Sequence, residues 1–208
     1  MNKSAKKFNK LGVFFTLIVT IGFLFCALAW NNLWKPPDTA SAKDIRKNIQ
    51  NTFLNLQTIS LAQTEYKKTD WDNDGKNLYA KYYIHLWTSV STTSEPIKVK
   101  LIPKKLAFAI EAARAIDGYY FIDLHDTRLA DNQLQPLDYE KQWAILAMPP
   151  NESQNQVLYF LADNSGNIFV QLSKYISPEY IESPIANGWT KIETIQQLND
   201  FLNSSLQK

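Results

Sequence analysis

A short acidic stretch is the part of this sequence whose spacing best suits chemistry. Asp70, Asp72 and Asp74 stand at alternate positions, and Gly75 follows them. A calcium ion takes about six to eight oxygen ligands, and this spacing lets successive carboxylates turn inward while glycine allows a tight turn. The backbone carbonyl of Lys76 would lie at the seventh position and add a ligand. The stretch therefore predicts a metal site at Asp70, Asp72, Asp74 and Lys76, with calcium as the cofactor.

The same stretch has a second interpretation, as an acidic turn held by hydrogen bonds from side chains to the backbone. An EF-hand loop ends in a glutamate that gives two oxygens, and Lys81 stands at that position here. A full EF-hand is therefore excluded. A calcium ion would need a carboxylate from elsewhere, and Glu65 on the preceding segment is one candidate. From the sequence, the calcium loop and the acidic turn both stay open.

The histidines give a weaker signal. His85 and His125 are the two in the chain, and imidazoles so far apart do not define a zinc site without further ligands. His125 beside Asp126 suggests the general base of a hydrolase, but no nucleophile motif accompanies the pair. The chain lacks the Gly-x-Ser-x-Gly, His-Glu-x-x-His and phosphate-binding glycine motifs. The sequence therefore predicts a protein that is not an enzyme and assigns no catalytic residue.

Six aromatic residues offer one more candidate site, a ligand groove. More often, such residues fill a half-buried sheet, which is the interpretation that we favour. They are Tyr79, Tyr82, Tyr83, Trp87, Tyr119 and Tyr120.

The elements that must position these residues follow an apolar stretch. Residues 11–30 contain no charge and no proline, and their length suits a helix that crosses the roughly 30 Å core of a bilayer. The basic segment 1–10 precedes them and carries lysines but no acid. This bias keeps the N-terminus in the cytoplasm. We therefore expect a single-pass protein of the cytoplasmic (inner) membrane, with a C-terminal periplasmic or external domain.

Cleavage of this stretch as a signal peptide is the main alternative to an anchor. Residues 27–29 (ALA) resemble a cleavage site. However, the run is longer than the usual apolar region of a signal peptide, and Trp30 and Trp34 suit the aromatic belt of a membrane interface. We therefore favour an uncleaved anchor, followed by a linker over residues 31–41.

Two further export routes fit the sequence less well. Lipoprotein processing needs a small residue before the cysteine, and Phe25 precedes Cys26. A type IV prepilin would need glycine where residue 14 is phenylalanine, and Pro36-Pro37 would interrupt its long helix. Because Cys26 is the single cysteine, the exported domain has no disulfide and no thiol nucleophile.

The charges of the exported part are nearly balanced. Four of the 22 Lys+Arg lie before the apolar stretch, which leaves 18 against 20 Asp+Glu. Acidic and basic residues are mixed along the chain, so this part is not expected to bind nucleic acid. The 45% of hydrophobic residues is enough for a packed core.

A long helix opens the predicted domain, which covers residues 42–208. Ile45, Ile49, Phe53, Leu56 and Ile59 recur at spacings of three and four over residues 41–67 and so share one face. We expect this face to pack on a sheet rather than on a coiled-coil partner, because the repeat is short.

Strands and short helices are predicted after this helix. Residues 119–124, 143–148, 156–162 and 167–172 are apolar runs typical of strands, and their short connections favour an antiparallel sheet. Residues 78–90 suit either a strand or a helical turn, 103–116 a helix, and 126–140 a loop. Thr190 and Glu193 form a capping box that begins a last helix. The fold class is therefore α+β, with an N-terminal transmembrane helix and a long amphipathic helix packed on an antiparallel sheet.

The order of these parts resembles the pseudopilin-like α+β head of bacterial envelope proteins. It is most similar to a family of uncharacterised exported proteins that share a domain of unknown function. The resemblance implies a pilin-like head and a non-enzymatic role, through protein interaction or as a structural part, with another envelope protein as the partner. The stretches that carry it are 56–66 (LQTISLAQTEY), 70–75 (DWDNDG) with Tyr79-Ala80, 118–121 (GYYF) and 163–169 (DNSGNIF).

Three functions follow from the sequence. The first is a membrane-anchored envelope protein that binds other envelope components. The second is a calcium-stabilised extracytoplasmic binding module that uses Asp70, Asp72 and Asp74. The third, and the least supported, is a hydrolase with His125 and Asp126 as its base.

Overall fold

The fold is known from a computed structural model that describes residues 42–71, 74–129, 133–150 and 157–205. Apart from Ala42, the described residues belong to one compact unit, Lys43–Lys208. Its helices and strands are, in chain order, α2 (Ala42–Lys67), η1 (Tyr83–Leu86), β1 (Thr88–Val90), β2 (Pro96–Lys98), α3 (Lys104–Ala107), η2 (Ala112–Arg114), β3 (Tyr120–Leu124), β4 (Asp126–Arg128), β5 (Leu134–Pro136), β6 (Ala144–Met148), β7 (Val157–Asp163), β8 (Ile168–Ser173), β9 (Tyr180–Ile181), η3 (Ile185–Asn187), β10 (Thr190–Ile192) and α4 (Ile195–Ser205).

The basic segment 1–10, the predicted membrane span 11–30 and the linker 31–41 lie outside the described residues. Within the part of the chain that the structure describes, no helix combines the length and the apolar character needed to cross a bilayer. The anchor and its orientation therefore stay predictions.

Helix α2 forms where the apolar spacing predicted it, and its inner face lies in the core. Phe53, Leu56 and Ile59 are at most 1% exposed. Full burial of one such side chain contributes about 1.5–3 kcal/mol, so this face holds the helix firmly on the sheet. Ile45 departs from the prediction, because half of its surface is exposed. It belongs to the same stripe but lies in the first turn, and the buried part of the stripe begins at Ile49.

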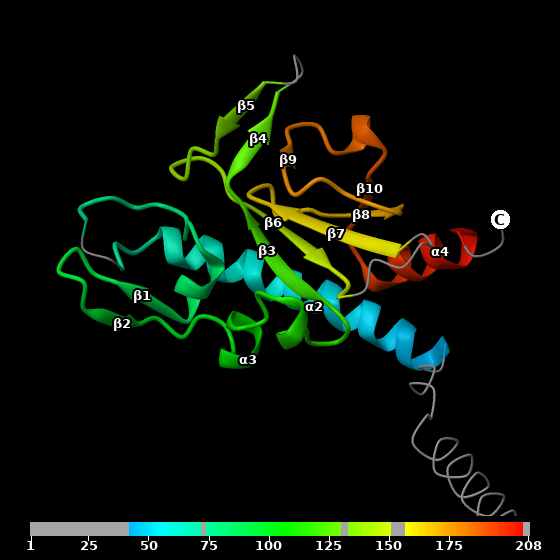
Figure 1. The fold of residues 1–208 in the computed structure, drawn as a ribbon, viewed down its shortest axis with the longest axis horizontal. Helices are drawn as coiled ribbons and strands as arrows, with labels where there is room; N and C mark the ends of the chain where they lie inside the picture. The colour runs from blue at the N-terminus through cyan, green and yellow to red at the C-terminus, as the bar shows by residue number, and fades with distance from the viewer. Residues whose placement is uncertain (1–41, 72–73, 130–132, 151–156, 206–208) are drawn as a thin grey trace, which may run out of the picture. The chain divides into compact units, whose positions relative to one another are not determined.

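The main sheet has five strands in the order β10-β8-β7-β6-β3, and all its pairs are antiparallel. The predicted strands are confirmed within one or two residues at each end, and β7 and β8 form the predicted hairpin. Residues of β6 alternate between two cores, because Ile145 and Ala147 face the α2 side while Ala144 and Leu146 face the other. The domain is therefore α+β, with a long helix on one face of an antiparallel sheet (Figure 1).

A second, three-stranded sheet covers part of the other face, and it corrects the prediction of a loop over 126–140. Strand β4 pairs with β5 as an antiparallel hairpin and with the distant β9 in parallel. Its neighbours Leu137 and Tyr180 are buried in the second core. The strands are short and β5 is wholly exposed, so their sequence lacks the apolar alternation that marks a strand.

The predicted helix over 103–116 is also wrong. Helix α3 ends at Ala107, and the next residues leave the helical path because the carbonyl of Ala109 accepts the N–H of Phe121 at 2.8 Å. Tertiary pairing with the start of β3 thus overrides the local preference of an alanine-rich stretch. The 78–90 stretch combines both alternatives, since it holds the single turn η1 and then the short strand β1.

The last helix begins later than predicted. Thr190 opens strand β10, and α4 starts at Ile195. The cap is Thr194, whose Oγ1 accepts the N–H of Gln197 at 3.2 Å, while the Gln197 side chain accepts the N–H of Glu193 at 2.7 Å. The pattern of a hydroxyl followed three residues later by an amide is therefore the one that caps this helix.

Candidate functional site

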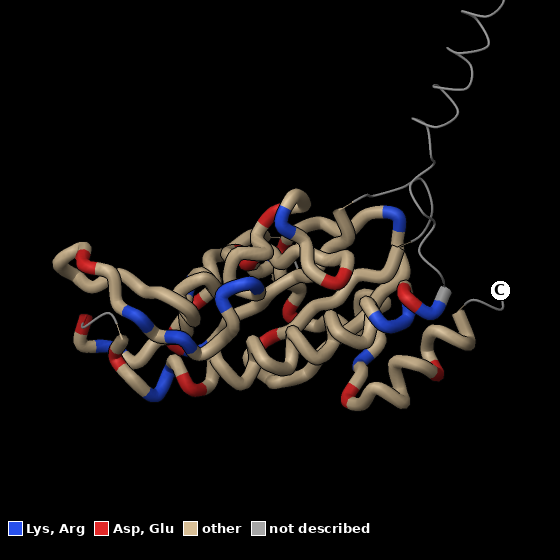
Figure 2. The backbone as a smooth tube through the Cα atoms, turned by 90° about the horizontal axis from the view of Figure 1, so that it is seen from below, with Lys and Arg blue, Asp and Glu red and all other residues tan. Residues whose placement is uncertain are grey.

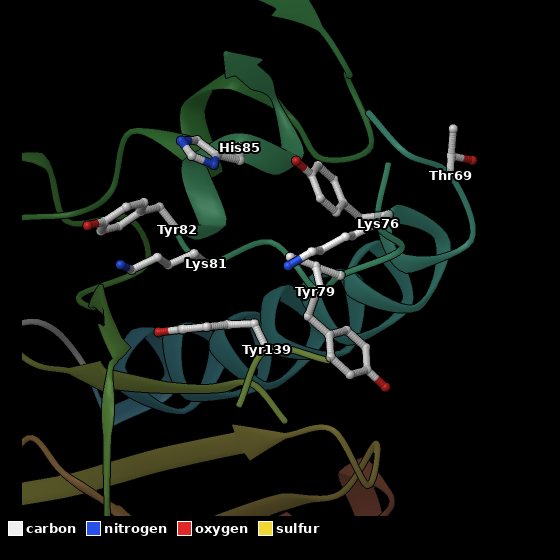
Figure 3. A pocket seen from close by; sticks show the side chains of 9 residues that line it. Thr69, Lys76, Tyr79, Lys81, Tyr82, His85 and Tyr139 are labelled. Atoms are coloured by element: carbon white, nitrogen blue, oxygen red, sulfur yellow. The ribbon is translucent and has the colours of Figure 1, made fainter. Parts of the chain in front are cut away.

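A hollow of about 250 Å³ lies where the end of α2, the segment after it, η1 and the chain before β6 meet. We call it the tyrosine–lysine pocket. Figure 3 shows side chains of these segments around the hollow, with the ring of Tyr79 turned away from the others. Its lining includes Lys76, Tyr79, Lys81, Tyr82, His85 and Tyr139.

Buried hydrogen bonds fix the segment that carries most of these side chains. The amide of Gln63 on α2, 2% exposed, donates to the carbonyl of Ala80 at 3.0 Å and accepts its N–H at 2.9 Å. The N–H of Tyr79 donates to the carbonyl of Tyr139 at 3.0 Å. These bonds satisfy backbone groups that no regular sheet pairs, and they hold the two sides of the pocket together.

The rings of Tyr82, His85 and Tyr139 line one wall of the pocket, and His125 packs behind them. The ring of Tyr82 meets the rings of His85 and His125 edge to face, with centroids 5.4 and 5.1 Å apart. Behind it, Nδ1 of His125 and the hydroxyl of Tyr139 share a hydrogen bond of 2.7 Å. Edge-to-face contacts of this kind add about 0.5–1.5 kcal/mol each, so the wall is ordered before any ligand arrives.

Burial shifts the pKa values of the side chains in and behind this wall. It lowers the pKa of His85, and together with the nearby ammonium of Lys81 it lowers the pKa of His125. Burial, with the nearby carboxyl of Asp123, raises the pKa of Tyr139 to about 12. Both imidazoles are therefore neutral at neutral pH and Tyr139 keeps its proton, so lysines supply the positive charge of the pocket.

Asp123 is the unusual acid beside this site, and sequence reasoning missed it. It lies on the α2-facing side of β3, because Phe121 shares that side and its cross-strand partner Ile145 is 1% exposed. Its Oδ1 accepts the N–H of Tyr83 at 2.9 Å, which favours the charged form. Burial is the larger effect and raises the pKa of Asp123 to about 7.

The acidic loop is seen in part. Both carboxylate oxygens of Asp70 accept backbone N–H groups, from Asp74 at 3.0 Å and from Gly75 at 2.9 Å. An oxygen of Asp74 accepts the N–H of Lys76 at 2.8 Å. These bonds are the ones expected for the acidic turn. Asp72 lies outside the described residues, and among those that are described no group of three metal-ligating side chains comes together.

The other predicted site residues fall in different places. The side chain of Lys76 lines the pocket, and Glu65, the candidate for an extra carboxylate, pairs with Lys68 at 2.9 Å. His125 bonds to a tyrosine, while Asp126 beside it is exposed.

The six aromatic residues, for which we favoured packing on a half-buried sheet over a ligand groove, divide between the pocket and the cores. Tyr79 and Tyr82 line the pocket, whereas Tyr83 and Tyr119 belong to the core. Trp87 packs partly buried against the first core and Tyr120 against the second. Tyr139 was missed, because nothing in the sequence shows that a residue sixty positions away joins Tyr79.

A second hollow of about 290 Å³ lies between β4 and the chain around η3. Its guanidinium, from Arg128, pairs with the carboxylate of Glu179. That cation is already neutralised, so this hollow offers less to a charged ligand than the tyrosine–lysine pocket.

No family model, curated protein or solved structure matches this chain.

Proposed function

We propose that the chain is a single-pass membrane protein of the cell envelope whose exported domain, residues 42–208, acts by binding and not by catalysis. In this proposal residues 11–30 cross the cytoplasmic membrane and the domain faces the periplasm or the outside. The observation that carries the binding role is the tyrosine–lysine pocket, a hollow lined by rings and cations and held open by buried hydrogen bonds.

The resemblance to pseudopilin-like proteins belongs to the same proposal. It is supported by the position of α2 along one face of the antiparallel sheet and by the acidic loop that follows the helix. A helix held on a sheet in this way presents the loops at its far end as a rigid surface. Such a surface suits a partner in the envelope, and we propose another envelope protein as that partner.

The charge distribution supports a partner other than nucleic acid. Acidic and basic residues are mixed over the described part of the domain, so neither sign of charge dominates it (Figure 2). Nucleic-acid binding relies on basic stripes, because phosphates are neutralised by clustered Lys and Arg.

Photo-crosslinking in the native membrane tests the binding role. Tyr82 on the pocket wall, 42% exposed, is replaced with p-benzoylphenylalanine, and Tyr175, 63% exposed and outside the pocket lining, serves as the control position. We expect a discrete adduct from position 82 and none from position 175. If position 82 yields only the monomer, the binding of an envelope protein at this pocket is wrong. A phosphatase fused to the C-terminus tests the orientation, since it is active only outside the cytoplasm.

A calcium-stabilised binding module is the second candidate, and one observation favours it. Gly75 has a φ of +81°, the conformation that a tight calcium-binding turn requires of its glycine. A carboxylate oxygen that accepts one N–H bond keeps a lone pair for a metal, so the bonds of Asp70 are compatible with a ligand role.

Thermal melting decides between the calcium loop and the acidic turn. Calcium at about 1 mM, the affinity range of extracellular modules, is expected to raise the melting temperature relative to chelator. Asp74→Asn keeps the oxygen that accepts the N–H of Lys76 and removes a charge, so it should reduce this rise. Asp200→Asn, at an exposed position of α4, is the matched control. A melting temperature that calcium leaves unchanged excludes the site.

A further inference from the structure

Two lysines of the tyrosine–lysine pocket are available for a ligand. Lys76 and Lys81 line the hollow, and within the described ranges neither has a carboxylate within 4 Å. The nearby Lys68, by contrast, is paired with Glu65. Two unpaired ammonium groups at one hollow repel a cation and attract an anion.

The hydroxyl of Tyr139 adds a neutral donor to these charges. When the Nδ1–H of His125 donates to its oxygen, the Tyr139 proton is free to bond a ligand atom. Asp74 lies close by, since its carboxylate accepts the backbone N–H of Lys76, but no acidic residue is part of the described pocket lining. An oxygen anion such as a carboxylate therefore finds both positive charge and a hydrogen-bond donor.

The rest of the lining is flat and largely apolar. Tyr82, His85 and Tyr139 line the hollow and bring carbon surface to a space of about 250 Å³, and Figure 3 shows the side chains of Tyr82 and Tyr139 extending to the same side. Pockets for drug-sized ligands begin near roughly 300 Å³, so a smaller occupant with one ring fits this one. Aromatic side chains favour a planar partner that stacks or meets them edge to face.

From this arrangement we infer that the tyrosine–lysine pocket binds a small organic acid that carries one flat ring, with its carboxylate attracted by the ammonium groups of Lys76 and Lys81. The ring lies against Tyr82 and Tyr139. Inorganic phosphate would pair with the lysine charges but leave the aromatic wall uncovered. A neutral ring would cover the wall but leave the lysine charges unpaired. The inference deepens the proposed binding role and rests on it. The acid is either free or a group on a larger envelope molecule.

Ligand-detected saturation-transfer NMR tests the inference with the full-length chain in lipid nanodiscs and benzoate as the probe. Benzamide keeps the ring without the charge, and acetate and inorganic phosphate keep a charge without the ring. We expect benzoate to bind at least ten-fold more tightly than each of them. The double substitution Lys76→Ala and Lys81→Ala should weaken benzoate at least ten-fold, because both ammonium groups that attract its carboxylate are lost.

The matched control is Lys98→Ala with Lys174→Ala, which removes the same charge from exposed positions outside the pocket lining. Benzoate that binds no better than benzamide, or equally well to both double variants, overturns the inference.

Crosslinking at Tyr82 separates the sources of the acid and the two proposals. An adduct of protein or polymer size that benzoate displaces means that the acid is carried on a larger molecule, and benzoate binding without any such adduct means a free acid. If the adduct forms but benzoate neither binds nor displaces it, the ligand class is wrong while the binding role stands. If neither an adduct nor benzoate binding is found, the binding role and the ligand class are both wrong.

Discussion

The most direct test of the structure is to remove the buried charge of Asp123. This carboxyl lies on the α2-facing side of the sheet, and burial raises its pKa from 3.8 to about 7. In the unfolded chain it ionises near its ordinary pKa. Between about pH 4 and pH 7 the folded state therefore holds the proton more tightly, so the free energy of unfolding falls as the pH rises through this window and levels off above it.

Asp123→Asn removes this cost and keeps an oxygen that accepts the N–H of Tyr83. A shift of about three pH units corresponds to about 4 kcal/mol at 1.36 kcal/mol per unit. Asp123 is not fully buried by surface area, so water screens part of this cost, and we expect a gain of about 2–3 kcal/mol at pH 8. At pH 4 the native carboxyl is neutral in the fold, and the gain should be close to zero.

The assay is urea unfolding of the full-length chain in detergent, followed by tryptophan fluorescence at pH 4, 6 and 8. Asp200→Asn, an exposed substitution of the same type, is the control and should give the same small change at every pH. An Asp123→Asn variant that is no more stable than the natural chain at pH 8, or that gains equally at pH 4 and 8, would refute the reasoning.

The same unfolding assay checks three further predictions. Leu56→Ala, at a position that is 0% exposed, should lower the free energy of unfolding by about 3 kcal/mol, whereas Leu61→Ala on the same helix, 73% exposed, should change it by less than about 0.5 kcal/mol. Equal losses would mean that α2 packs by another face. Gln63→Leu should lower the free energy of unfolding by about 2–3 kcal/mol, because it leaves the buried N–H and C=O of Ala80 unpaired. A decrease as small as that of Leu61→Ala would contradict the role given to these hydrogen bonds. Thr127→Val should stabilise the domain by about 1 kcal/mol, since its buried hydroxyl has no hydrogen-bond partner among the described residues, and a destabilised variant would show that the hydroxyl is satisfied.

The candidate site was predictable only in pieces. The sequence pointed to the loop after α2, and the described carboxylates there make the turn bonds that one interpretation expects. Tyr82 and His125 also stood out, but as members of separate hypotheses. The structure joins them at 5.1 Å and adds Tyr139, because the 79–82 segment and the chain before β6 are tied together through α2 and the backbone.

What the sequence alone determined is the set of elements whose periodicity is local. The stripe of α2 buries one face, and the apolar runs of β3, β6, β7 and β8 are buried on one or both faces. The burial of apolar surface is the main driving force of folding, so these local patterns are enough to predict the elements. The tertiary structure alone decided the ends of 103–116, the hairpin of β4 and its pairing with β9, and the raised pKa of Asp123. These features depend on partners tens of residues away in the chain. Such partners supply hydrogen bonds and exclude water, and no short stretch of the sequence predicts either effect.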